Sequence, residues 1–84
     1  MDNVDKTMKI STTELNRLEI QTIIRKVYNA LKQKGYDPIS QIVGYIMSGD
    51  PSYITSFADA RVLITKVERD DLLEEFVRSY VGNI

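Results

Sequence analysis

Apolar residues recur every three or four positions in four segments of the chain, which predicts amphipathic helices. Ser11 and Glu14 form a capping box, so we expect the first helix to begin at Ser11, and Gly35 is a typical residue to end it. Leu15 and Leu18 project away from its stripe, so either the helix starts later or they contact something outside its core face. The stripe of this first helix is Ile20, Ile23, Ile24, Val27 and Leu31.

Two Asp-Pro pairs divide the middle of the chain. Asp is a favoured N-cap and Pro a favoured first helical residue, so Asp37-Pro38 predicts a second helix, which ends at Gly49. Asp50-Pro51 repeats the signal and predicts one helical turn over residues 51–54, with Tyr53 and Ile54 pointing inward. The second helix is expected to pack on the core through its apolar stripe, which is Ile39, Ile42, Val43, Ile46 and Met47.

A stripe of small residues, Ser40, Gly44 and Ser48, runs along a neighbouring face of the second helix. A glycine inside a helix costs about 1 kcal/mol relative to alanine. A close helix–helix approach would explain that cost, so we name these three residues as a dimer contact. A glycine that is merely tolerated is the alternative.

The last third of the chain carries two apolar stripes that are out of phase. The charged run 68–71 interrupts them, which predicts either two helices meeting there or one bent helix. Glu74 and Arg78 have the i, i+4 spacing of a helical ion pair. The first stripe is Val62, Leu63, Ile64 and Val67, and the second is Leu72, Leu73, Phe76, Val77, Tyr80 and Val81.

These patterns predict an all-α fold, a compact bundle of about four to five short helices. No segment shows the alternation of a strand. Residues 1–10 have no sustained period and are expected to form a mobile N-terminal tail, followed by a single helical domain over residues 11–84. A domain of this size buries only about 60% of its unfolded surface, which favours a homodimer.

Composition excludes several classes of chemistry. The chain has no cysteine and no histidine, which excludes disulfides, Cys/His zinc sites and catalysis by either residue. Its formal net charge of -1 gives no general attraction to nucleic acid or anionic lipid. The N-terminus is not a signal peptide and no segment is apolar enough to span a bilayer, so we expect a cytoplasmic protein.

No group of residues resembles an active site. The densest acidic cluster is expected to be a solvated helix face rather than a metal or acid–base site, and no glycine-rich phosphate loop is present. We therefore predict no enzymatic activity, no cofactor and no bound metal. The acidic cluster is Asp70, Asp71, Glu74 and Glu75.

A helix-turn-helix reading of residues 38–69 supplies the alternative function, a small helical nucleic-acid-binding protein. The cations Arg61, Lys66 and Arg69 would have to read the groove, but acidic residues are interspersed among them. An acidic or phosphorylated protein surface is one alternative partner for these cations, and a solvated, salt-bridged surface without a partner is the other. Salt-sensitive binding in a gel-shift assay would favour the alternative.

The runs GYDPI, QIVGY and SGDPSYI within residues 34–54 closely resemble the IreB/ReoM family of low-GC Gram-positive bacteria. Further matches follow in the same order at Ala60-Arg61, Glu68-Arg69-Asp70 and 77–80. The resemblance covers about residues 34–81, and Asp5-Lys6-Thr7-Met8 is similar to the family's tail motif.

The resemblance implies a small, helical, dimeric cytoplasmic regulator without enzymatic activity. It implies that a membrane Ser/Thr kinase with PASTA domains phosphorylates Thr7. It also implies two further partners, which are ClpC-type protease machinery and the first committed enzyme of peptidoglycan synthesis. These partners in turn imply a role in cell-wall stress and β-lactam tolerance. On this reading the basic residues Arg61, Lys66 and Arg69 bind a partner, whereas nucleic acid and membrane insertion are not expected.

The chain departs from the family pattern at several positions. Val4 replaces a second tail threonine, Thr55-Ser56 replaces Pro-Arg, and Thr65 replaces Arg. These changes reduce the basic surface of the fourth predicted helical segment. Phosphorylation of Thr7 would still add about -1.5 to -2 charges to a tail whose own side chains sum to zero.

Overall fold

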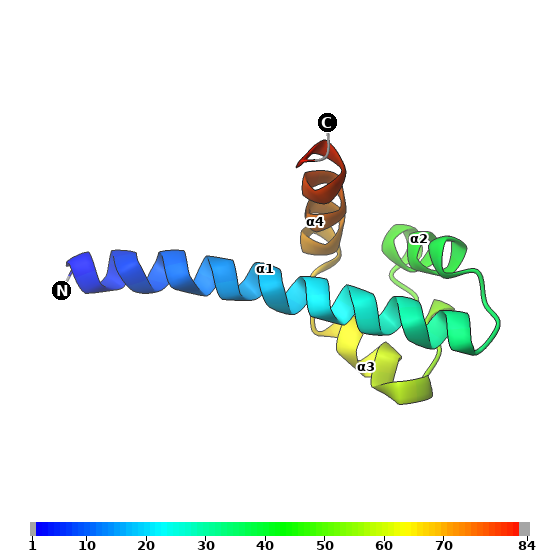
Figure 1. Cartoon of the computed structure of the whole chain (residues 1–84). Coiled ribbons are helices and arrows are strands. Elements are labelled where there is room, and N and C mark those ends of the chain that lie inside the picture. Colours follow the sequence, from blue (N-terminus) through cyan, green and yellow to red (C-terminus); the bar gives the residue numbers. More distant parts are fainter. Residues whose placement is uncertain (1, 83–84) are drawn as a thin grey trace.

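The longest element is helix α1 (Asp2–Gln33), which has 32 residues. The computed structural model describes the backbone of residues 2–82 and the side chains of residues 16–82. At 1.5 Å per residue α1 is about 48 Å long, and it accounts for the longest molecular dimension of 49 Å. Its N-terminal half extends away from the other helices, which gather around its C-terminal half (Figure 1).

The start of α1 corrects one prediction. The helix begins at Asp2, nine positions before Ser11, so the capping box does not mark its N-terminus. Whether residues 1–10 are mobile stays a prediction. The end is as predicted, because Gly35 adopts a left-handed conformation with φ of 85° and its N–H donates to the carbonyl of Lys32.

Helix α2 (Pro38–Ser48) has the predicted bounds and caps. The carboxylate of Asp37 accepts a hydrogen bond from the N–H of Ile39 at 3.2 Å. At the other end Gly49 is left-handed, with φ of 75°, and its N–H donates to the carbonyl of Tyr45. Both caps satisfy backbone groups that a helix end leaves unpaired.

Two short 3₁₀ turns follow, η1 (Pro51–Tyr53) and η2 (Phe57–Asp59), and η2 leads into helix α3 (Ala60–Thr65). The predicted turn over residues 51–54 is confirmed as η1. The last two residues of η2 are consecutive non-glycine residues with positive φ, Ala58 at 54° and Asp59 at 61°. This conformation is unfavourable for L-residues.

The interruption at residues 68–71 separates two helices, as one of the two alternatives predicted. Helix α3 ends at Thr65 and helix α4 (Arg69–Gly82) begins four residues later. In Figure 1, α4 extends away from the middle of α1 at a steep angle to it, while α2 and α3 lie on opposite sides of the C-terminal half of α1. Within residues 2–82 the fold is all-α, as predicted.

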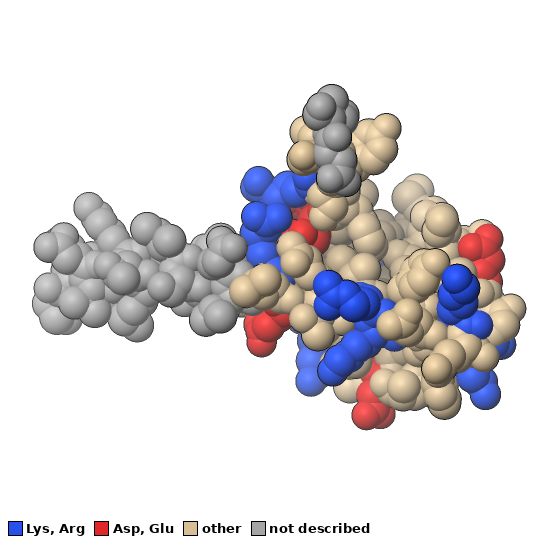
Figure 2. All heavy atoms as spheres, viewed as in Figure 1, with Lys and Arg blue, Asp and Glu red and all other residues tan. Residues whose placement is uncertain are grey.

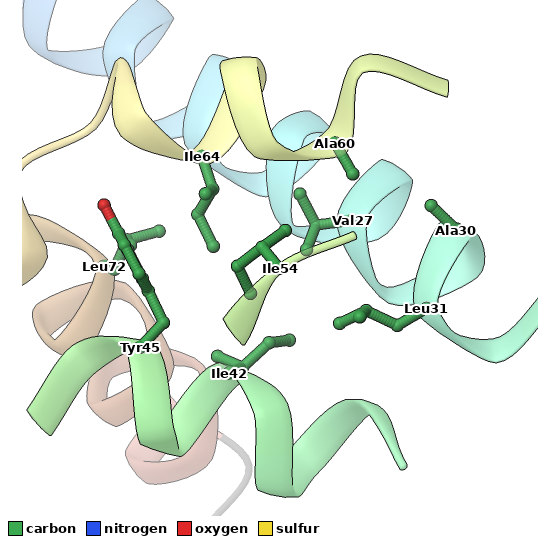
Figure 3. Close-up of a cluster of buried hydrophobic side chains, with 9 residues drawn as sticks. All are labelled: Val27, Ala30, Leu31, Ile42, Tyr45, Ile54, Ala60, Ile64 and Leu72. Atoms are coloured by element: carbon green, nitrogen blue, oxygen red, sulfur yellow. The ribbon is translucent and has the colours of Figure 1, made fainter. Parts of the chain in front are cut away.

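The core lies between α1, α2 and α3 (Figure 3). Ile54, on the segment between η1 and η2, is fully buried at its centre. Leu72 is the hydrophobic residue that α4 contributes. The buried hydrophobic residues are Val27, Ala30, Leu31, Ile42, Tyr45, Ile54, Ala60, Ile64 and Leu72.

The face of α2 that packs on the core differs from the predicted one. Ile42 and Tyr45 are buried, whereas Ile39 and Met47 are 70% and 79% exposed and Val43 is also exposed. The prediction was wrong for these three residues. Helix α2 contacts the core through one edge of its apolar stripe, and the other edge is exposed to solvent. We call Ile39, Val43 and Met47 the α2 stripe.

Candidate functional site

The predicted phospho-acceptor Thr7 lies on the backbone of α1, in its second turn. The structure describes side chains from residue 16 onward, so the side chain of Thr7 is not among them. The described candidate residues are therefore those of α1 from residue 16 onward, of α2, α3 and α4, and of the turns between them.

The turn Ser48–Ser52 joins α2 to η1 and is held by its own side chains. The Asp50 carboxylate accepts from the N–H of Ser52 at 3.0 Å, and the Ser48 hydroxyl accepts from the N–H of Asp50 at 3.0 Å. Hydrogen bonds from Ser52, aided by the positive charge of Arg61, lower the pKa of Asp50. Asp50 thus caps the N-terminus of η1 as a carboxylate.

Two of the three predicted partner-binding cations contact the chain on either side of that turn. Arg61 donates from Nε to the carbonyl of Ile54 at 2.9 Å. Arg69 donates from Nη1 to the carbonyl of Ile46 at 2.9 Å, and its guanidinium lies against Gly49, where a Cβ would be 2.9 Å from Cζ. A cation at the end of α2 also suits the helix dipole.

Lys66, the third predicted cation, is exposed at the C-cap of α3. It contributes to the rim of a hollow of about 370 Å³ between α1 and α3, together with Leu18, Thr22 and Leu63. Leu18 is half-exposed there, which agrees with its position off the core stripe. The three cations therefore do not converge on one pocket.

Basic and acidic side chains are mixed on the visible surface. In the view of Figure 2, Lys and Arg are interspersed with Asp and Glu and form no continuous basic track. Helix α3, which would be the recognition helix of a helix-turn-helix, has six residues, and its Arg61 is directed back to a main-chain carbonyl. This arrangement does not favour the nucleic-acid alternative.

The small-residue stripe of α2 has contacts within the chain. A Cβ on Gly44 would be 2.5 Å from Cε1 of Tyr53, so the tyrosine ring packs directly on the glycine. The hydroxyl of Ser40 donates to Asp37 at 2.9 Å, and that of Ser48 donates to the carbonyl of Gly44 at 2.7 Å. Gly44 thus allows a close approach of η1, and a dimer contact here stays a prediction.

The predicted solvated acidic cluster separates into two kinds of residue. Asp70, Asp71 and Glu74 are exposed, and Glu74 makes the predicted ion pair with Arg78 at 2.6 Å. Glu75 is only 3% exposed, so the solvated reading was wrong for it. The sequence held a signal: on a helical wheel Glu75 lies only about 60° from the core-facing position of Leu72.

The buried carboxylate of Glu75 binds residues of α1. It accepts from Arg17 Nε at 3.1 Å and from Gln21 Nε2 at 2.8 Å, and the hydroxyl of Ser79 is 3.4 Å away. The hydrogen bond from Arg17 is the largest cause that lowers the pKa of Glu75; burial opposes it, and Gln21 and Ser79 support it. We call these four residues the Glu75 cluster.

A comparison with known protein families matches residues 5–82 to the IreB regulatory phosphoprotein. The chain belongs to the IreB regulatory phosphoprotein family. The match extends the sequence resemblance toward both ends and includes Thr7. It supports a regulatory phosphoprotein role and is not a match to an enzyme family.

Two exposed apolar stripes are the surface feature that the sequence did not reveal. The α2 stripe is one; the other, which we call the α4 stripe, is Leu73, Val77, Tyr80 and Val81. Helices α2 and α4 are in contact, so the two stripes belong to neighbouring elements. Among the described residues no helix is long and apolar enough to cross a membrane.

Proposed function

We propose that this member of the IreB family is a non-enzymatic cytoplasmic regulator whose partner binding changes when Thr7 is phosphorylated. The observation that carries the proposal is the family match over residues 5–82, which includes Thr7. A phosphate there adds about -1.5 to -2 charges. The side chains of residues 1–10 sum to zero, with Asp2 and Asp5 against Lys6 and Lys9, so the modification reverses the local sign.

The finer role follows the family resemblance in the sequence. The kinase is a membrane Ser/Thr kinase with PASTA domains. The regulated process is peptidoglycan synthesis, with an effect on β-lactam tolerance through ClpCP-dependent proteolysis of the first committed enzyme. Support for these steps comes from the motifs over residues 34–81.

Arg61, Lys66 and Arg69 form the proposed partner-binding set. A guanidinium has five N–H donors, so the main-chain bonds of Arg61 and Arg69 leave donors for a carboxylate or phosphate of a partner. Those bonds also fix the direction of each side chain, which lowers the entropy lost on binding. The exposed ammonium of Lys66, at the C-cap of α3, adds a third positive charge to the set.

Homodimerisation is the second part of the proposal. The α2 and α4 stripes supply an apolar surface of the kind that a stable interface buries, because grouped exposed apolar residues on a small domain mark interaction sites. They are a better candidate for the contact than Ser40, Gly44 and Ser48, whose hydroxyl and backbone contacts lie within the chain. A second copy would cover both stripes.

A pull-down from cell lysate tests the switch. Wild type, Thr7→Ala and Thr7→Glu are used as baits, with Thr22→Ala as a control on the same helix. We expect Thr7→Glu to change the captured partners relative to Thr7→Ala, and Thr22→Ala to behave as wild type. Identical partners and yields for both Thr7 variants would contradict the proposal.

A further inference from the structure

Helix α4 is attached to the rest of the chain mainly through its first half. Its buried residues are Leu72 and Glu75, and Phe76 is partly buried beside them. Every residue from Val77 to Gly82 is exposed. The second half of α4 therefore projects from the molecule, as Figure 1 shows.

The attachments differ in their distance from the connection that precedes α4. Arg69 binds the end of α2, but it is the first residue of the helix. Leu72 lies one turn farther along. Glu75 is the outermost buried residue, and its partners Arg17 and Gln21 lie on α1. A contact far from the connection that precedes α4 restricts the orientation of the helix more than a contact close to that connection.

The polar nature of this outer restraint distinguishes it from ordinary core packing. A buried carboxylate that loses its donors is strongly destabilising, so the contact is strong only while Arg17 and Gln21 both keep their positions. The Arg17 side chain is 41% exposed, so water can reach one side of the ion pair. Such a contact can be broken without opening the hydrophobic core.

We propose that the Glu75 cluster is a latch that holds α4 across α1, and that its loss lets α4 rotate about the connection 66–68. The α4 stripe moves with the helix, so the latch sets how that stripe lies relative to the α2 stripe. The structure assigns Arg17 and Gln21 as positioning residues for α4, not as partner contacts.

The latch gives α1 a route to the apolar surface of α4. Thr7 lies ten residues before Arg17, about 15 Å along a helix, which exceeds the Debye length of about 8 Å at physiological ionic strength. Direct attraction between a phosphate on Thr7 and Arg17 would therefore be largely screened, so an effect on the latch would have to pass through α1 itself. This regulatory use rests on the proposed function, whereas the latch itself does not.

Distance measurements by electron paramagnetic resonance test the latch in the unmodified full chain. The chain has no cysteine, so spin labels attach only to the cysteines that are introduced. One pair, Lys26→Cys with Gly82→Cys, spans α1 and the end of α4; a control pair, Lys26→Cys with Val62→Cys, spans α1 and α3. All three positions are exposed. Dilution with unlabelled chain removes distances between copies.

Glu75→Gln and Arg17→Met are introduced into both pairs, with Glu74→Gln as the matched control on the exposed neighbour. We expect the α1–α4 distribution to change from one narrow peak to a broad one in both latch variants, the α1–α3 distribution to stay narrow, and Glu74→Gln to change neither. A narrow, unshifted α1–α4 distance in Glu75→Gln overturns the proposal, as does broadening of both pairs. Because no phosphorylation is involved, an unchanged pull-down with Thr7 variants leaves this result standing.

Discussion

Gly44→Ala is expected to destabilise the protein even though alanine is the better helix former. The new Cβ would be 2.5 Å from Cε1 of Tyr53, about 1 Å inside the optimum carbon–carbon separation of about 3.5–4.0 Å. Overpacking of this kind costs about 1–3 kcal/mol, and the helix propensity gained is about 1 kcal/mol. The net effect is a loss of about 0–2 kcal/mol.

A double-mutant cycle with Tyr53→Ala makes the prediction sharp. Without the ring, only the propensity gain remains, so Gly44→Ala should then stabilise the chain by about 1 kcal/mol. Urea denaturation followed by circular dichroism gives the four free energies of unfolding. If Gly44→Ala stabilises the wild type and the Tyr53→Ala variant equally, the ring does not pack on Gly44. A loss that depends on protein concentration and not on Tyr53 would instead indicate a dimer contact.

Three further predictions follow from the backbone, the Glu75 cluster and the exposed stripes. Ala58→Gly should raise the free energy of unfolding by about 0.5–1 kcal/mol, because glycine accepts the positive φ, whereas Ala60→Gly in α3 should lower it. Urea titration measures both changes, and a lower free energy of unfolding for Ala58→Gly would contradict the positive φ assigned to Ala58. The pKa of Glu75 is below its ordinary value of 4.5, so the contribution of this carboxylate to the free energy of unfolding is complete above that value and is lost as the pH falls through the folded pKa. The free energy of unfolding of Glu75→Gln should therefore fall less steeply with decreasing pH than that of the wild type. Identical acid-denaturation curves for the two proteins would refute this. Val43→Lys should give a monomeric mass by light scattering with its melting temperature retained, whereas Val62→Lys, at a similarly exposed position, should stay dimeric. A dimeric mass for both variants would exclude the α2 stripe from the interface.

Most helix boundaries could be predicted from local chemistry. Asp37, Pro38 and Gly49 delimit α2 because caps and left-handed residues act within one turn. The start of α1 could not, because the capping box around Ser11 does not prevent a longer helix from continuing through it. A local signal states where a helix can begin and not where it must.

Burial was harder to predict than secondary structure. The apolar spacing of α2 does not show which edge of the stripe meets the core, so Val43 and Met47 were placed inside. Glu75 was placed in solvent because its neighbours Asp70, Asp71 and Glu74 are solvated. Its partners lie more than fifty residues away in the sequence, and only the assembled fold brings them together.

The candidate site shows the same limit. Sequence motifs named Arg61 and Arg69 as cations for a partner, and they could not show that each also binds a main-chain carbonyl on either side of the Ser48–Ser52 turn. These contacts depend on how α3 packs against η1 and how α4 packs against α2. The arginines consequently have a structural role beside the proposed binding role.

Phosphosite mapping tests the central claim most directly. The full chain is incubated with ATP and a membrane Ser/Thr kinase of the PASTA type, digested, and sequenced by mass spectrometry beside Thr7→Ala. We predict phosphate on Thr7 in the wild type and none on the corresponding peptide of the variant. Phosphate found only at other residues would contradict the assignment of Thr7 as the switch.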